Sequence, residues 1–112
     1  MILQPYEGIP PIKRFVTGSY IGDDAETQTI DLGFQPKAVL TAEKSGRMGF
    51  ERTSASAKVY GGLAMPGKPV TTEGVIVLEV TGTGFAVHKP SDANGYISTN
   101  LSGNIYYYIA FI

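Results

Sequence analysis

The chain has 112 residues, about one average domain, and its 9 Lys and Arg against 10 Asp and Glu give a net charge of −1. This balance argues against a nucleic-acid-binding domain, which usually presents a basic face. The absence of cysteine excludes disulfides and cysteine nucleophiles, and the single histidine argues against a His-based metal site or catalytic triad. With 14 glycines, 7 prolines and 43% hydrophobic residues, the composition indicates short apolar strands joined by many turns.

The N-terminal segment differs in composition from the rest of the chain. Three prolines lie within residues 1–12, so we expect an extended arm there and a single domain over residues 13–112. No basic start with a following apolar stretch precedes the domain, and the longest apolar run, 105–112, is too short to cross a bilayer. We therefore expect synthesis in the cytoplasm and no membrane insertion.

Strand patterns then follow one another, and helical periodicity is absent. The expected strands are 14–20, 27–32, 37–42, 58–60, 74–80, 85–88 and 104–112. Glycines in 81–84 predict a tight hairpin between two of them, and 33–36 turns the chain. The remaining segments are predicted as loops: 43–57 (alternatively a weak hairpin), 61–69 and 89–103, of which the first and last face outward. The pattern predicts an all-β protein, an antiparallel β-sandwich of about six to eight strands.

The last strand, 104–112, has no polar face. Ile105, Tyr107, Ile109 and Phe111 alternate with Tyr106, Tyr108, Ala110 and Ile112, so both faces are apolar or aromatic. A sandwich covers one face of each sheet, and the other face of this strand needs a second cover. We expect that cover to be another copy of the chain, with Tyr106, Tyr108 and Ile112 as interface candidates. Loops or the proline-rich arm folding over that face are the alternative.

Motifs for catalysis or cofactor binding are weak. Gly62 to Lys68 has the glycine and lysine spacing of a phosphate-binding loop, but Pro69 replaces the Ser or Thr that would hold Mg²⁺ and Pro66 removes an amide. His88 has no neighbouring pattern that would make it a catalytic base. We expect no enzymatic activity, no cofactor and no metal.

A sugar site is a different candidate, because aromatic faces beside amides can stack on and hydrogen-bond a saccharide. The residues that suggest such a surface are Tyr60, His88, Asn94, Tyr96 and Asn100. Packing in the core or at an interface is the alternative use of the tyrosines.

Four stretches together resemble a domain of phage and prophage virion proteins, found in tail fibres and adhesins. They are Phe15–Asp24, Thr29–Leu40, Gly74–Val87 and Tyr106–Phe111, and the resemblance covers about residues 15–112. The order of these motifs is also similar to the H-type lectin layout, although the last strand lacks tryptophan. That layout implies a six-stranded antiparallel sandwich that forms a trimer around its sugar site.

The resemblance implies a non-enzymatic virion structural protein, with a tail-fibre or receptor-binding role on a host-surface glycan. A capsid or tail decoration or scaffold protein that binds no receptor is the alternative. The implied partners are further copies of the chain, with a trimer favoured, and other virion proteins. After synthesis in the bacterial cytoplasm the protein would be virion-associated.

Overall fold

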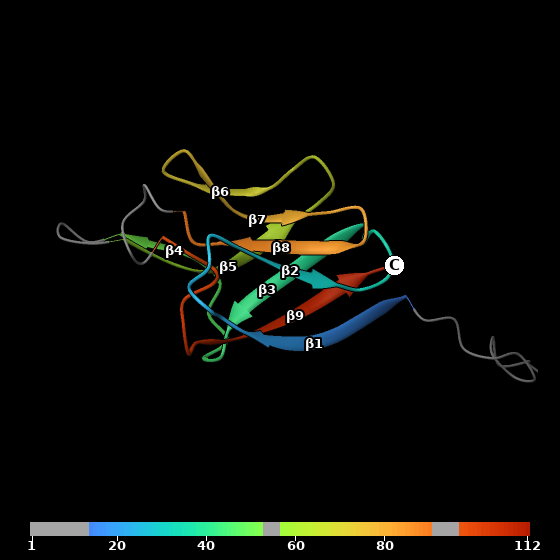
Figure 1. The fold of residues 1–112 in the computed structure, drawn as a ribbon, viewed down its shortest axis with the longest axis horizontal. Helices are drawn as coiled ribbons and strands as arrows, with labels where there is room; N and C mark the ends of the chain where they lie inside the picture. Colours follow the sequence, from blue (N-terminus) through green and yellow to red (C-terminus); the bar gives the residue numbers. More distant parts are fainter. Residues whose placement is uncertain (1–13, 53–56, 91–96) are drawn as a thin grey trace, which may run out of the picture.

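A computed structural model describes residues 14–52, 57–90 and 97–112, which form an antiparallel β-sandwich without helices (Figure 1). The all-β prediction is confirmed, with nine strands in these residues rather than six to eight. The expected arm, residues 1–12, lies outside the described residues. The strands are β1 (Phe15–Ile21), β2 (Thr27–Asp31), β3 (Ala38–Glu43), β4 (Gly49–Arg52), β5 (Ala57–Ala64), β6 (Val70–Thr72), β7 (Val75–Val80), β8 (Gly84–His88) and β9 (Ile105–Phe111).

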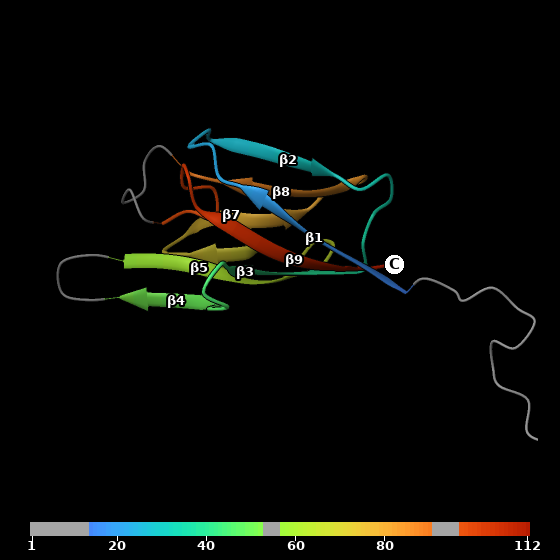
Figure 2. The same cartoon turned by 90° about the horizontal axis from the view of Figure 1, so that it is seen from below.

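Two sheets pack face to face, as the edge-on view in Figure 2 shows. One has five strands in the order β1-β9-β3-β5-β4, and the other has four in the order β2-β8-β7-β6. The predicted hairpin is confirmed, because β7 pairs antiparallel with β8. Residues 33–36 do not close a hairpin, since they carry the chain from β2 in one sheet to β3 in the other.

The predicted turn-rich segment 61–69 is partly wrong, because β5 continues through Gly61 and Gly62 to Ala64. At Gly61 the backbone has a φ of 155°, and a Cβ atom there would lie 2.1 Å from the carbonyl oxygen of Thr41 on β3. Glycine is therefore required at this position by the close approach of the neighbouring strand. The same residue type that predicted a turn instead permits a continuous strand.

The main core lies between the sheets and is built around aromatic rings. The rings of Tyr20 and Tyr106 stack with their centroids 5.0 Å apart. The ring of Phe85 meets the rings of Tyr20 and Tyr108 edge to face, with centroid distances of 6.0 Å and 5.1 Å. Phe85 and Tyr106 are fully buried. Such edge-to-face and offset pairs add to the free energy gained from burial of the rings.

The prediction that the segment 89–103 faces outward is wrong for residues 97–100, since Ile97, Ser98, Thr99 and Asn100 are buried. The Thr99 hydroxyl donates to the carbonyl oxygen of Val77, and the Tyr20 hydroxyl donates to the carbonyl oxygen of Thr99 at 2.8 Å. Ile97 packs in a second, smaller hydrophobic cluster with Val77. Small polar residues can enter the interior here because their hydrogen-bonding groups find partners.

Candidate functional site

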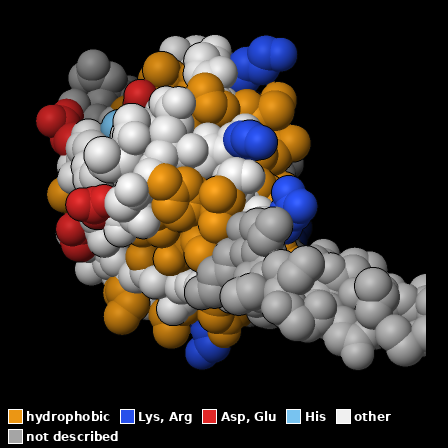
Figure 3. All heavy atoms as spheres, turned by 90° about the vertical axis from the view of Figure 1, so that its right-hand side faces the viewer, with side chains coloured by type: hydrophobic (Ala, Val, Ile, Leu, Met, Phe, Trp, Pro, Cys, Tyr) orange, Lys and Arg blue, Asp and Glu red, His pale blue; other side chains and the backbone are white. Residues whose placement is uncertain are grey.

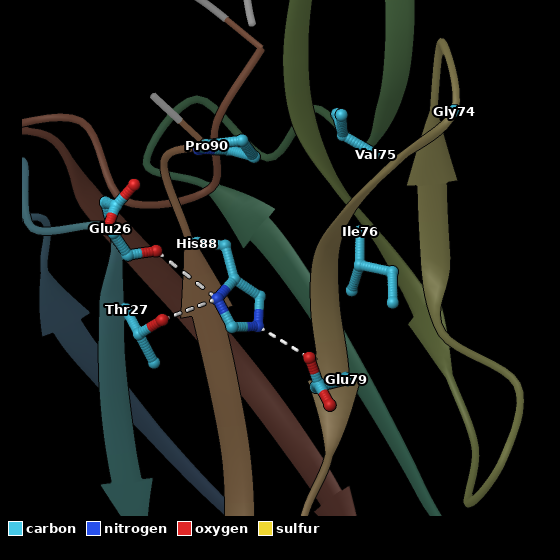
Figure 4. A pocket seen from close by; sticks show the side chains of 8 residues that line it. All are labelled: Glu26, Thr27, Gly74, Val75, Ile76, Glu79, His88 and Pro90. Atoms are coloured by element: carbon cyan, nitrogen blue, oxygen red, sulfur yellow. Dashed lines mark hydrogen bonds and ion pairs between the residues drawn. The ribbon is translucent and has the colours of Figure 1, made fainter. Parts of the chain in front are cut away.

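A cleft of about 480 Å³ opens beside the four-stranded sheet, and His88 and Glu79 point toward each other within it (Figure 4). One side of the cleft is polar, and the other is formed by aliphatic side chains and the β6–β7 turn. Its lining residues are Glu26, Thr27, Gly74, Val75, Ile76, Glu79, His88 and Pro90.

Strand register explains why the polar groups meet. Thr27 on β2 lies directly opposite His88 on β8, and Glu79 on β7 lies opposite Ala86, two residues before His88. The imidazole Nε2 lies 2.7 Å from Oε2 of Glu79. The Nδ1 atom lies 3.0 Å from the Thr27 hydroxyl and 3.3 Å from the carbonyl oxygen of Glu26. Both imidazole nitrogens thus have partners, which fixes the orientation of the ring.

The hydroxyl, imidazole and carboxylate are connected in the order used by nucleophilic hydrolases. However, Glu26 and Glu79 both line the cleft and bring negative charge to it. Glu79 would be the carboxylate of such a triad, but Glu26 is an additional one. Its charge would destabilise an oxyanion that developed there, whereas acyl transfer needs donors aimed at the oxyanion. The cleft is better suited to binding, with carboxylate, carbonyl and hydroxyl oxygens as acceptors and the aliphatic wall as an apolar contact surface. The Glu79 side chain is 41% exposed, so its carboxylate is accessible to a ligand.

Sequence reasoning identified His88 but missed its partners. Glu79 and Thr27 are 9 and 61 residues away in the chain, so no local motif connects them with His88. Alternation along the strands could place both side chains on polar faces. It could not show that β2 and β7 both flank β8.

Tyr60, predicted as part of a sugar-binding surface, is buried and covered by cations. The guanidinium of Arg47 lies 4.0 Å from the ring centroid, the ammonium of Lys58 lies 4.9 Å from it, and Arg47 Nη1 donates to the phenol oxygen at 3.0 Å. Only 7% of Tyr60 is exposed. The ring is thus engaged in cation–π contacts and is not free to stack on a sugar.

Asn100, also predicted at that surface, is instead fully buried. Its Nδ2 donates to Asp23 Oδ1 at 2.7 Å and to the carbonyl oxygen of Ala25 at 3.0 Å. Its Oδ1 accepts from Gln28 Nε2 at 2.6 Å. The side chain therefore anchors the β1–β2 connection. Asn94 and Tyr96 lie outside the described residues. Of the three suggested residues that the structure describes, His88 lines the cleft and Tyr60 and Asn100 do not.

The three oligomer candidates, two on β9 and one just after it, differ in burial. Tyr106 is fully buried in the core and Tyr108 packs against it, whereas Ile112 is 44% exposed. Tyr107 and Ile109, which the interface prediction left out, point outward. The sequence showed two apolar faces, and the structure identifies the face with Tyr107 and Ile109 as the one left uncovered by the described residues.

We use the name outer apolar face for the outward side of β1, β9, β3 and the end of β5. Cross-strand register places its residues in rows: Phe15, Thr17, Ser19, Ile21, Ala38, Leu40, Ala42, Gly61, Leu63, Ile105, Tyr107, Ile109 and Phe111. None of these residues is charged. Leu40, Ala42, Tyr107 and Ile109, together with Met48, also line a hollow of about 160 Å³. Figure 3, which views the end where β9 finishes, shows hydrophobic side chains gathered between carboxylates on one side and Lys and Arg on the other.

The outward side of the four-stranded sheet is different. Its rows contain Thr27 beside His88, and Thr29 beside Ala86 and Glu79. The chain thus follows the usual rule of apolar inside and polar outside on one sheet and departs from it on the other.

Within the described ranges, no group of three or more His, Cys, Asp or Glu residues is arranged to hold a metal ion. No described residue belongs to a helix that is long and apolar enough to cross a membrane.

No protein-family model matches the chain, and the comparisons with curated proteins and with solved structures also returned no significant match.

Proposed function

We propose that this chain is a non-enzymatic structural protein of a phage or prophage particle that assembles with copies of itself through the outer apolar face. The observation that carries the proposal is the contrast between the two sheets. Thr29, Glu79 and His88 give the four-stranded sheet a polar outward side, whereas the outer apolar face on the five-stranded sheet has no charged residue. Surfaces of the second kind mark interaction sites.

The size of the face supports an interface. Its exposed fractions reach 53% at Phe15, 61% at Ile21, 50% at Leu63 and 48% at Tyr107. With about 200 Å² for each large side chain, the exposed hydrophobic residues present roughly 600 Å². This is at the upper end of the largest patch on a typical monomer and approaches the ~800 Å² that each partner buries in a stable complex.

A second copy is the occupant that we propose for this face. Both partners of a symmetric contact present the same surface, and an uncharged surface carries no like-charge repulsion when it meets itself. The virion assignment is supported by the motifs at Phe15–Asp24, Thr29–Leu40 and Tyr106–Phe111, which resemble phage tail-fibre and adhesin domains.

The assembly is tested with Ile109→Lys, which places a charge in the middle of the outer apolar face. Light scattering behind a sizing column should give a multiple of 12.0 kDa for the wild type and a smaller mass for Ile109→Lys. Thr29→Lys, on the polar side of the other sheet, is the matched control and should retain the wild-type mass. A monomeric wild type, or an Ile109→Lys variant that assembles normally, contradicts the proposal. Circular dichroism verifies that all three proteins are folded.

The virion role needs a separate test. In particles purified from a bacterial strain that carries the gene, mass spectrometry should detect the chain at a constant ratio to the major structural proteins. If the chain is absent from the particles, the virion assignment is wrong, but the proposed self-assembly is not contradicted.

Receptor binding is a second candidate function, and the cleft around His88 and Glu79 is the observation that favours it. Its acceptor oxygens and aliphatic wall suit a saccharide with several hydroxyl groups. On a glycan array the wild type should bind a subset of bacterial surface glycans, and Glu79→Gln and His88→Ala should lose that binding. Asp31→Asn, on β2 but outside the cleft lining, is the control. If no glycan on the array binds the wild type, the receptor-binding proposal fails. The alternative, a scaffold protein that recognises no receptor, then remains.

A further inference from the structure

The two sheets end in four edge strands, and β1 differs from the other three. β4 contains Glu51 and Arg52 and a break in register between Gly49 and Phe50. β6 has three residues and is also irregular, and β2 has five residues and ends in Asp31. Charges, bulges and short length are the features by which proteins prevent pairing at a sheet edge.

β1 has none of these features. Its seven residues, FVTGSYI, contain no charge and no proline, and its pairing with β9 runs without a break in register. It lies at the margin of the five-stranded sheet (Figure 1), with β9 as its only strand neighbour among the described residues. A long regular edge of this kind is a template for another strand.

The backbone groups available for pairing follow from the hydrogen bonds at the two ends of β1. The amide of Ile112 donates to the carbonyl oxygen of Arg14, and the amide of Gly22 donates to that of Asn104. The backbone N–H and C=O groups of even-numbered residues in β1 therefore point toward β9. Those of odd-numbered residues point away from it, toward the free edge of the sheet. Consistent with this alternation, the carbonyl oxygen of Ile21 accepts a bond from outside the sheet, from Gln28 Nε2 at 3.1 Å.

We propose that β1 pairs antiparallel with β1 of a second copy, about a twofold axis that passes beside Gly18. This proposal rests on the proposed self-association and adds a second contact to it, at the edge of the same sheet. Hydrogen bonds between the two strands can form only between backbone groups that point to the free edge. Odd-numbered residues of one strand must therefore lie opposite odd-numbered residues of the other. Centring on Gly18 satisfies this rule and aligns the strands over their full length, with Phe15 opposite Ile21 and Thr17 opposite Ser19.

This register also partners the side chains. Ile21 and Phe15 are the most exposed large hydrophobic residues in the described chain, at 61% and 53%, and they lie at the two ends of β1. Antiparallel pairing places each against the other, as an aromatic and β-branched cross-strand pair. Shifting the centre to Thr17 or Ser19 would leave one end of each strand without a partner.

The backbone contribution is sufficient for a specific contact. The four outward-facing residues of each strand would exchange about six to eight backbone hydrogen bonds with the partner, allowing for the bond that Gln28 already makes. Interfaces of standard size contain about ten. Pairing would also join the two five-stranded sheets and make the outer apolar face continuous across the dimer.

The first test is Thr17→Pro, which removes an outward N–H group while the bonds to β9 remain. Proline is tolerated on an edge strand where its missing N–H faces away from the sheet. The matched control is Thr29→Pro on the edge strand β2. The carbonyl oxygen of Glu26 and the amide of Leu32 bond toward the β8 side, so by alternation the N–H of Thr29 points to the free edge. Thr17→Pro should raise the dimer dissociation constant about a hundredfold or more, and Thr29→Pro should leave it unchanged.

The second test reads out the register. The chain has no cysteine, so Phe15→Cys and Ile21→Cys each introduce a single thiol. A short bifunctional thiol reagent should link the two variants to each other when they are mixed. Neither variant should be linked when it is alone, because identical positions at the strand ends would lie about 20 Å apart.

Three results would overturn the pairing: a trimeric wild type, an unchanged dissociation constant for folded Thr17→Pro, or cross-links that form equally without mixing. If Ile109→Lys dissociates the assembly while Thr17→Pro does not, the outer apolar face mediates assembly and β1 does not. A wild type that is monomeric at every concentration contradicts both proposals.

Discussion

Replacement of Asn100 by alanine should be among the most destabilising single changes to a polar residue in this protein. The fully buried side chain makes four hydrogen bonds, two from Nδ2 to Asp23 Oδ1 and the Ala25 carbonyl and two to Oδ1 from Gln28 Nε2 and the Asp23 amide, at 2.6–3.2 Å. At about 1 kcal/mol for each bond, and with partial hydration of the partners after the change, Asn100→Ala should lower the free energy of unfolding by about 3 kcal/mol. For a domain of this length, that corresponds to a fall in Tm of about 13 °C.

Urea denaturation followed by circular dichroism measures this loss directly, and Gln35→Ala is the matched control. Gln35 is an exposed amide, so its replacement should change the free energy of unfolding by no more than about 0.5 kcal/mol. Asn100→Asp keeps the shape but places an acceptor where Nδ2 now donates, so it should also destabilise the protein. A loss below about 1 kcal/mol in Asn100→Ala would refute the view that this residue anchors the β1–β2 connection.

Three further predictions concern the core and the response to pH. Phe85→Ala should cost about 3–5 kcal/mol, because the ring is fully buried; a smaller loss in urea denaturation would mean that the core collapses around the cavity. The backbone N–H of Ser102 and the ammonium of Lys89 lower the pKa of Asp24, so its contribution to stability is present above the ordinary aspartate pKa and is lost as pH falls through the lowered value. Asp24→Asn should flatten this acid-side loss in thermal melts, and an unchanged slope would contradict the contacts. Burial raises the pKa of Tyr20 far above its ordinary value, so the stability that depends on its neutral form is complete below about pH 10 and falls at higher pH. Denaturation between pH 9 and 11 should show a smaller fall for Tyr20→Phe, and equal falls would count against this reasoning.

Strand positions were largely predictable from the sequence where alternation and turn residues agreed. The β7–β8 hairpin is an example, because the glycines of 81–84 separate two apolar runs and no other local structure competes. β4 was not foreseen as a firm strand, because it is exposed along its length and has no apolar alternation to mark it. Its pairing depends on β5, a contact that local pattern does not encode.

The candidate sites were less predictable, since each depends on which side of a strand faces the core. On β9 both faces are apolar, and only packing against Phe85 and Tyr20 selects Tyr106 for the interior. Asn100 has a residue type favoured on surfaces, yet bonds from the β1–β2 connection satisfy it inside the molecule. The contact of His88 with Glu79 likewise requires two strands to be adjacent.

The features that favour assembly all belong to one sheet. The edge strand without charges or a bulge is β1, and the outer apolar face begins on that same strand with Phe15 and Ile21. The cleft around His88 lies instead beside the other sheet, whose outward side contains His88 and the charged residue Glu79. Changes at sites that share no partners are usually additive. Substitutions in β1 should therefore alter assembly without altering ligand binding in the cleft, and Glu79→Gln should do the reverse, so that the two proposed roles can be tested separately in one protein.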